Sequence, residues 1–523
     1  MSHQIFHSGH ILTQDPLQPV AEAMSVSDGR IVYIGSNADV LAMRQPHTAL
    51  SSLHGRTVLP GFNDCHVHLW KVGNLRTYLL DLRGVGSIAE MQQKLVEFAQ
   101  HKPKGAWIQA RGYNEVIFSE RRHPTLADLD AVLPDNPVCV MRTCAHQIVV
   151  NSRALAACQL PNNIEIAGGE VKRLADGALS GHFTETAIGL IINKIPSYSA
   201  TEYREMILAA QRECLKLGIT SATDPAVMPD LLAVYRDMDA NQDLQMRINA
   251  FPIRIPDGGT AVLPLPERYE SENLTINCVK FFADGGLSGQ TAALFSPYLG
   301  GNERGVLRLD RKVFLHLAQE AADAGFRIAT HAIGDEAIQF VLDVYQNMRP
   351  AAHTNHPFRL EHVGFPSQQN LDIMRRIGVG AAMQPIFIYE LGGNFSTALE
   401  PERLERTYPI RSVIKSGVTV GISTDAPVVR NLNPFVNLRA AISRTDTTGR
   451  VIGPDERLTL DESIRAYTLG SATLQDTEHR VGSLKIGLLA DFITLSAPIT
   501  AENLATLRVE ATYIGGQKVF ERH

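Results

Sequence analysis

Short apolar runs rich in β-branched residues alternate with amphipathic stretches through the middle of the chain. Most runs are followed by residues with helical spacing, as at 311–324 and 338–346. The runs are 57–60, 219–224, 246–252, 278–284, 327–333, 358–363, 379–385 and 418–425. Eight strand-then-helix units predict an α/β fold, a (β/α)8 TIM barrel with buried parallel strands. A doubly wound sheet also alternates, but it usually has fewer units and a glycine-rich phosphate loop.

Both ends of the chain have a different pattern, of short strands joined by turns. We therefore predict one small β-sandwich domain built from residues 1–56 and 480–523. The barrel would take residues 57–74 and 200–479. About 160 residues separate the first two apolar runs, which is too long for a single loop. Residues 75–199 are therefore predicted to be an insertion, with its own strands and helices, over the carboxyl-terminal face of the barrel.

Composition excludes several classes of protein. Hydrophobic residues make up 44% of the 523 residues and charged residues 20%, a balance typical of a folded globular chain. The formal charge of −6 provides no basic surface for nucleic acid or an anionic membrane. We find no secretory signal and no apolar run of 18 residues, and the six cysteines are scattered. These features predict a cytoplasmic protein with reduced thiols that binds a small molecule, without nucleic-acid or membrane partners.

The first candidate for chemistry is a pair of histidines directly after the first apolar run. His66 and His68 are two residues apart, so on a strand both side chains point to the same side. Two imidazoles placed in this way can bind one divalent cation. Taken alone, a chance His-x-His in a loop explains the pair equally well.

Other runs carry ligand-type side chains at the same end. Catalytic groups of TIM barrels lie at the carboxyl-terminal ends of the strands. With the two histidines, five of the predicted strands would contribute to one site. The further residues are Lys280, His331, His362 and Asp425. A structural role accounts for one buried histidine but not for this whole set.

In this set of ligand-type residues, the sequence resembles the amidohydrolase superfamily of metal-dependent barrel hydrolases. Within it, the chain is similar to the family-3 branch of YtcJ-like and N-substituted formamide deformylase-like proteins. The resemblance covers nearly the whole chain, and it rests on specific segments. They are LPGFNDCHVHL, VKFFADGG, TAALFSPY, THAIGDEAI, EHVGF and STDAPV.

The resemblance implies a role for each ligand-type residue. His66, His68 and Asp425 would bind the more buried metal ion, and His331 and His362 the more exposed one. Lys280 would be carboxylated and would bridge the two ions. The alternative is an unmodified Lys280 paired with Asp284, with a single ion on the histidines. Histidine-rich ligation suits zinc, so the expected cofactor is one or two divalent ions, of which zinc is the first choice.

The implied reaction is hydrolysis of a C–N bond, in an amide or N-substituted formamide, by metal-activated hydroxide. Asp425 would act as general base and then as general acid. One alternative is a ring deaminase or cyclic-amide hydrolase on the same barrel, because fold alone does not decide between these reactions. A second alternative is a non-catalytic binding or regulatory barrel. Symmetric dimers are the commonest soluble assembly, so a homodimer is expected.

Four further residues are candidate substrate contacts. Trp70 follows the histidine pair, and His146 lies in a segment of the insertion that resembles a family segment near the pocket. Gln384 ends the seventh run. Gln290 stands where the branch often has an arginine, and it provides no permanent cation. Loss of this arginine favours a neutral or partly apolar substrate.

Overall fold

A computed structural model describes residues 3–523 except 144–145, 167–168, 258, 352–353 and 355. The chain has a mixed α/β fold and divides into two compact units. One unit consists of Met1–Leu69 together with Ala210–His523, and the other of Trp70–Ala209. Among the described residues, no helix has both the length and the apolar character needed to cross a bilayer.

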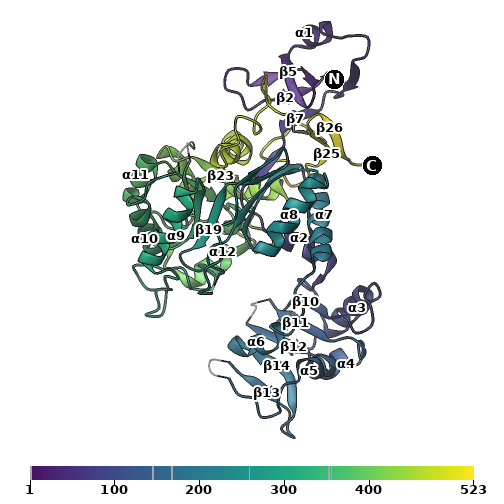
Figure 1. The fold of residues 1–523 in the computed structure, drawn as a ribbon, viewed down its shortest axis with the longest axis vertical. Helices are drawn as coiled ribbons and strands as arrows, with labels where there is room; N and C mark the ends of the chain where they lie inside the picture. The colour runs from purple at the N-terminus through teal and green to yellow at the C-terminus, as the bar shows by residue number, and fades with distance from the viewer. Residues whose placement is uncertain (1–2, 144–145, 167–168, 258, 352–353, 355) are drawn as a thin grey trace. The chain divides into compact units, whose positions relative to one another are not determined.

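The first unit has two small sheets, and the two ends of the chain meet in one of them (Figure 1). One sheet has the order β5-β4-β1-β6 and the other β26-β25-β24-β7-β2-β3. The rings of Phe492 and Tyr513 stack at 4.3 Å, and Phe6 packs edge-on against Phe492 at 5.0 Å. The strands are β1 (His3–His7), β2 (His10–Leu12), β3 (Val20–Ala21), β4 (Ala23–Ser27), β5 (Arg30–Gly35), β6 (Ala49–Ser52), β7 (Thr57–Pro60), β24 (Phe492–Leu495), β25 (Val509–Ile514) and β26 (Gln517–Glu521).

The first apolar run does not form the first strand of the central sheets, so that part of the strand assignment is wrong. β7 pairs with β2 and β24 in the terminal sheet, while the next strand, β8 (Phe62–Asp64), pairs with β15 (Ile219–Val227). The chain changes sheets at Gly61, where an added Cβ would lie 2.1 Å from Thr220 Oγ1. Residues 57–64 are all buried, so hydrophobicity alone does not reveal the crossing point.

Replacing Gly61 by alanine is expected to destabilise the first unit by about 1–3 kcal/mol, because the side chain of Thr220 is in the way. The matched control is Gly393→Ala, since nothing lies within 4 Å of a Cβ at that helical glycine. Urea unfolding followed by circular dichroism measures both variants. Equal midpoints for Gly61→Ala and the wild type would contradict the close approach.

The central part of the first unit consists of two mainly parallel sheets in the described part of the chain. Their orders are β17-β18-β16-β15-β8 and β19-β20-β21-β22-β23, in which only β17 runs antiparallel to its neighbour. A parallel bridge between Ile253 and Lys280 links the two sheets. Their remaining strands are β16 (Arg247–Pro252), β17 (Tyr269–Glu270), β18 (Leu274–Ile276), β19 (Cys278–Phe282), β20 (Arg327–Ala332), β21 (Phe358–His362), β22 (Val379–Met383) and β23 (Val420–Ile422).

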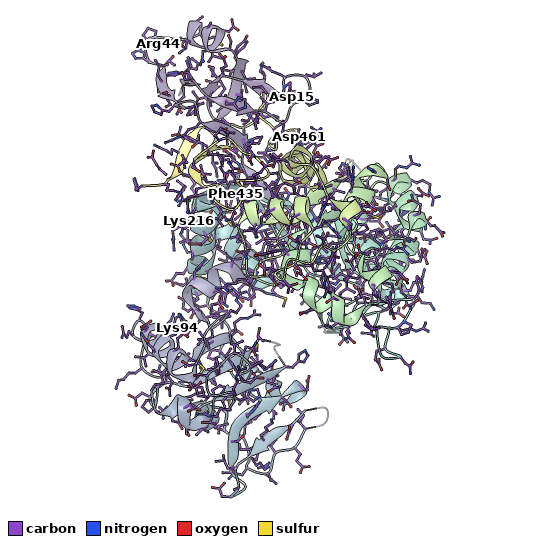
Figure 2. All side chains as sticks on the ribbon, turned by 180° about the vertical axis from the view of Figure 1, so that it is seen from behind. Asp15, Arg44, Lys94, Lys216, Phe435 and Asp461 are labelled. Carbon is purple, nitrogen blue, oxygen red and sulfur yellow. The ribbon has the colours of Figure 1, made fainter. Side chains whose placement is uncertain are left out.

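Helices follow these strands, as the alternating pattern predicts. Figure 1 shows α9, α10 and α11 side by side along the second sheet, and α9 and α11 both contact α10. Phe435 of α15, labelled in Figure 2, packs edge-on against Phe62 of β8 at 5.7 Å. Closure of the two sheets into one eight-stranded barrel remains a prediction. The main helices are α8 (Pro229–Ala240), α9 (Arg311–Asp323), α10 (Asp335–Tyr345), α11 (Gln368–Ile377), α12 (Ile386–Ala398), α14 (Ile410–Lys415), α15 (Pro434–Ser443), α16 (Leu460–Arg465) and α17 (Ser471–Leu474).

The second unit has its own sheet and its own cores. The sheet order is β13-β14-β12-β11-β10-β9 among the described residues. One apolar cluster surrounds Leu95 and Ile108, and another surrounds Ile148 and Phe183. The position of this unit over the first stays a prediction. Its elements include α2 (Leu69–Thr77), β9 (Leu79–Asp81), α3 (Ile88–Ala99), β10 (Ile108–Tyr113), α4 (Leu126–Asp130), β11 (Val138–Arg142), β12 (Gln147–Val150), α5 (Ser152–Cys158), β13 (Val171–Arg173), β14 (Leu179–Thr184), α6 (Gly189–Ile192) and most of α7 (Ala200–Lys216).

Candidate metal centre

Three buried side chains from different strand ends converge in the first unit. His66, His362 and Asp425 offer ligand atoms that all lie within 4.8 Å of one another. His68 joins them, because its Nε2 is 3.3 Å from Asp425 Oδ1, and His66 Nε2 is 3.4 Å from the same oxygen. Three imidazoles and a carboxylate in this arrangement form a suitable donor set for a divalent ion.

The backbone brings the histidine pair and Asp425 together. Asp425 N–H donates to the carbonyl of His66 over 2.8 Å, and His68 N–H donates to the carbonyl of Ala426 over 2.9 Å. Asp425 and His362 both have positive φ, 59° and 79°, which is uncommon for residues with a side chain. Such strain is often found at functional sites, where the surrounding structure holds it in place.

A buried carboxylate fixes the orientation of His66. Glu361 Oε2 lies 2.5 Å from His66 Nδ1, and Glu361 itself accepts two hydrogen bonds from Arg359, of 2.6 and 2.9 Å. Burial lowers the pKa of His66 to about 4, although Glu361 and Asp425 favour its protonated form. A neutral ring that donates from Nδ1 keeps the lone pair of Nε2 for a metal ion. The sequence reasoning missed Glu361 and Arg359, which lie two positions apart in β21, just before the predicted ligand His362.

Gln384 supports a second histidine. Its Oε1 lies 2.8 Å from His362 Nδ1, and its amide nitrogen donates to Ser423 Oγ over 2.8 Å. The second bond fixes the amide so that Oε1 accepts from the ring, which leaves His362 Nε2 for a metal ion. Gln384 is fully buried. These bonds favour a positioning role for Gln384 at His362, and its predicted contact with substrate stays a prediction.

Replacing Gln384 by methionine is expected to weaken metal binding by about 10–100-fold, because partners of ligating histidines commonly contribute that much. Titration with a competing chelator measures this affinity. Gln369→Met is the matched control, since Gln369 lies on α11 and is exposed. Equal affinity in both variants would show that Gln384 does not hold His362 for a metal ion.

Lys280 lies in β19 and is completely buried. Among the described residues, its Nζ has no hydrogen-bond partner, and it lies 4.9 Å from the centre of the Phe282 ring. Burial lowers its pKa to about 8. A buried amine without a hydrogen-bond partner lowers the stability of the fold. This position therefore fits a group that acquires a partner when a metal ion binds.

Asp284 does not pair with Lys280, which contradicts the alternative in which the two form an ion pair. Its carboxylate accepts backbone N–H bonds from Ala293, Ile333 and Gly334, of 2.8 to 3.1 Å. It also lies 3.3 Å from His331 Nε2, which is 3.0 Å from the carbonyl of Gly285. The ring of His331 is 4.5 Å from that of His362, so it borders the three-ligand cluster.

The other predicted substrate contacts lie elsewhere. Trp70 begins the second unit, where its ring packs against Tyr203 at 5.5 Å. His146 belongs to the same unit, is 65% exposed at its side chain and pairs with Glu185 over 2.9 Å. Gln290 is exposed in the loop after β19. Their contact with substrate stays a prediction.

Comparison with known proteins gives consistent matches over the full length of the chain. A sequence model of the amidohydrolase family matches residues 50–520. The putative amidohydrolase YtcJ of Bacillus subtilis (strain 168) is 29% identical, with 99% of each chain covered. N-substituted formamide deformylase of Arthrobacter pascens is 26% identical, with 98% of each chain covered. The crystal structure of an uncharacterized metal-dependent hydrolase from Pyrococcus horikoshii OT3 superposes with a TM-score of 0.80 at 25% identity, over 96% of this chain and 99% of that one.

Proposed function

The chain belongs to the amidohydrolase family, and we propose that it is a metal-dependent hydrolase that cleaves a C–N bond in an amide or N-substituted formamide. The observation that carries this proposal is the buried cluster of His66, His362 and Asp425 beside His68. A binding module without catalysis has no need of a carboxylate held between two imidazoles at a strained backbone position.

The residues that would hold a metal ion are His66, His68, His362 and Asp425, with His331 at the border. We propose that the bound ion is zinc. If Lys280 is carboxylated, a second zinc ion would bind as well. When bound, a divalent ion supplies an acidified water and polarises the carbonyl to be attacked. The same strand ends would then form the open face of a (β/α)8 barrel.

The chain's own residues provide the proton transfer and the orientation. Asp425 would accept a proton from the attacking water at one carboxylate oxygen and deliver it to the leaving amine nitrogen. Glu361 and Gln384 would keep the Nδ1 atoms of His66 and His362 protonated, so that each Nε2 faces the site. Burial of these groups excludes water from all but the open side, which strengthens their electrostatic interactions.

The test is elemental analysis of protein purified without chelator, followed by a screen of N-substituted formamides and linear amides. We expect one or two ions per chain and the appearance of formate or another carboxylate. Ammonia release from heterocycles, without activity on linear amides, would instead support a ring deaminase. Failure to retain any ion after reconstitution would overturn the hydrolase proposal and favour a binding barrel.

A further inference from the structure

A cavity of about 540 Å³ lies in the first unit, at the carboxyl-terminal ends of β16 and β19. Its size is in the range of small-molecule pockets. Its walls are part apolar and part polar, and the apolar part includes Ile255, Leu307 and Leu309. Its polar lining includes one cation, Arg308, and one anion, Asp257.

Phe282 borders both this cavity and the candidate metal centre. It lines the cavity, and its ring lies 5.3 Å from that of His331 and 4.9 Å from Lys280 Nζ. Phe282 is the last residue of β19, two positions after Lys280. A molecule in the cavity would therefore lie against a residue that also neighbours Lys280 and His331.

Arg308 approaches the site from the same side. Its backbone N–H donates to the carbonyl of Ala283 over 2.8 Å, which ties the arginine to the loop after β19. Its Nη2 lies 2.9 Å from the position that a Cβ would take at Gly285. The carbonyl of Gly285 is the partner of His331 Nε2 at 3.0 Å. The guanidinium thus stands beside the backbone that holds a predicted ligand.

Arg308 and Asp257 form an ion pair with each other, and both are partly accessible, 30% and 52% at their side chains. An exposed pair of this kind contributes little to stability. A substrate carboxylate matches the planar fork of the guanidinium as well as Asp257 does. Displacement of Asp257 by such a group would therefore cost little, while the apolar walls would cover the rest of the molecule.

Arg308 also bears on the substrate inferred from the sequence, where Gln290 stands in place of an arginine. Gln290 and Arg308 belong to one folded segment, because Val306 N–H donates to the carbonyl of Thr291 over 3.3 Å. Arg308 thus brings a guanidinium, paired with Asp257, to the same segment. The segment therefore contains a partner for a substrate carboxylate, and the neutral substrate inferred from Gln290 stays an alternative prediction.

We propose that this cavity binds the non-reacting end of the substrate, and that the substrate is an amide whose apolar body ends in a carboxylate that pairs with Arg308. This inference rests on the proposed function for its reaction, but the binding site itself can be tested without turnover. The reacting amide would face the metal ligands beyond Phe282. Asp257 would then act as the internal competitor for Arg308.

The test is calorimetric titration of the full chain, with its metal bound, using phenylbutyrate and its neutral counterpart phenylbutyramide. We expect the wild type to bind the carboxylate at least about tenfold more tightly, as one charge-assisted hydrogen bond allows. Arg308→Met should abolish this preference, and Asp257→Asn should increase it. Arg349→Met and Asp323→Asn are matched controls, because Arg349 and Asp323 form an exposed pair elsewhere.

An equal affinity for both probes in the wild type would overturn the proposal. A preference that persists in Arg308→Met would also overturn it, because the carboxylate would then bind elsewhere, for instance at the metal. Turnover of ω-formylaminoalkanoates and the matching alkanamides is measured separately. If neither series is hydrolysed, the proposed reaction fails, while the titration still decides whether Arg308 binds carboxylates.

Discussion

Replacing Asp425 by asparagine is expected to lower kcat by about 10³-fold, within the range typical of a lost general base. Asparagine has nearly the same shape, but its amide cannot accept a proton from water or return one to a leaving amine. Its carbonyl oxygen can still face His66 and His68, which lie 3.4 and 3.3 Å from Asp425 Oδ1. The variant should therefore keep part of its metal, and steady-state kinetics with elemental analysis measures both effects.

The matched control is Asp461→Asn, an exposed carboxylate in the first turn of α16 that is labelled in Figure 2. It should retain wild-type kcat and metal content. Unchanged turnover in Asp425→Asn would remove the proton-transfer role. Complete loss of metal in that variant would instead mean that Asp425 acts mainly as a ligand, and the decrease in kcat would then say nothing about a base.

The convergence of His66, His362 and Asp425 could be anticipated from sequence because it depends on two simple regularities. Side chains two residues apart on a strand share a side, and parallel strands end at a common edge. Each ligand-type residue lies within an apolar run or a few residues after one, so the run itself indicates its place in the fold. The exact grouping depends on loop conformations, such as the positive φ of His362, for which the sequence has no clear signal.

Other features required the three-dimensional structure. β7 and β8 form one uninterrupted buried run, so the sheet change at Gly61 leaves no trace in hydrophobicity. Gln384 ends an apolar run just as a catalytic residue would, and only its hydrogen bond to His362 reveals a supporting role. Arg308 lies far from every predicted ligand in sequence, and its proximity to Gly285 arises from how the loop after β19 folds back.

The pair of Arg359 and Glu361 links the stability of the fold to the metal centre. Both side chains are completely buried, and Arg359 also donates to the carbonyl of Cys65 over 2.8 Å, next to His66. Burial alone would raise the pKa of Glu361, but Arg359, Lys280 and His66 hold it well below its ordinary value. The carboxylate therefore has two tasks, to neutralise Arg359 and to orient His66.

Replacing Glu361 by glutamine should separate these tasks when it is combined with a second change. The single variant leaves Arg359 charged and buried without its counterion, so we expect a loss of about 3 kcal/mol in the free energy of unfolding. Metal affinity should also decrease by about 10–100-fold, because His66 loses its carboxylate partner. Urea unfolding and chelator competition measure the two quantities.

The double variant Arg359→Met with Glu361→Gln removes both charges, and an apolar replacement for a buried ion pair is often tolerated. We expect it to recover most of the lost stability but none of the lost metal affinity, because the carboxylate beside His66 is still absent. Recovery of both quantities would mean that Glu361 affects the metal site only through the fold. Recovery of neither would mean that Arg359 itself positions the backbone at Cys65, and with it the histidine pair.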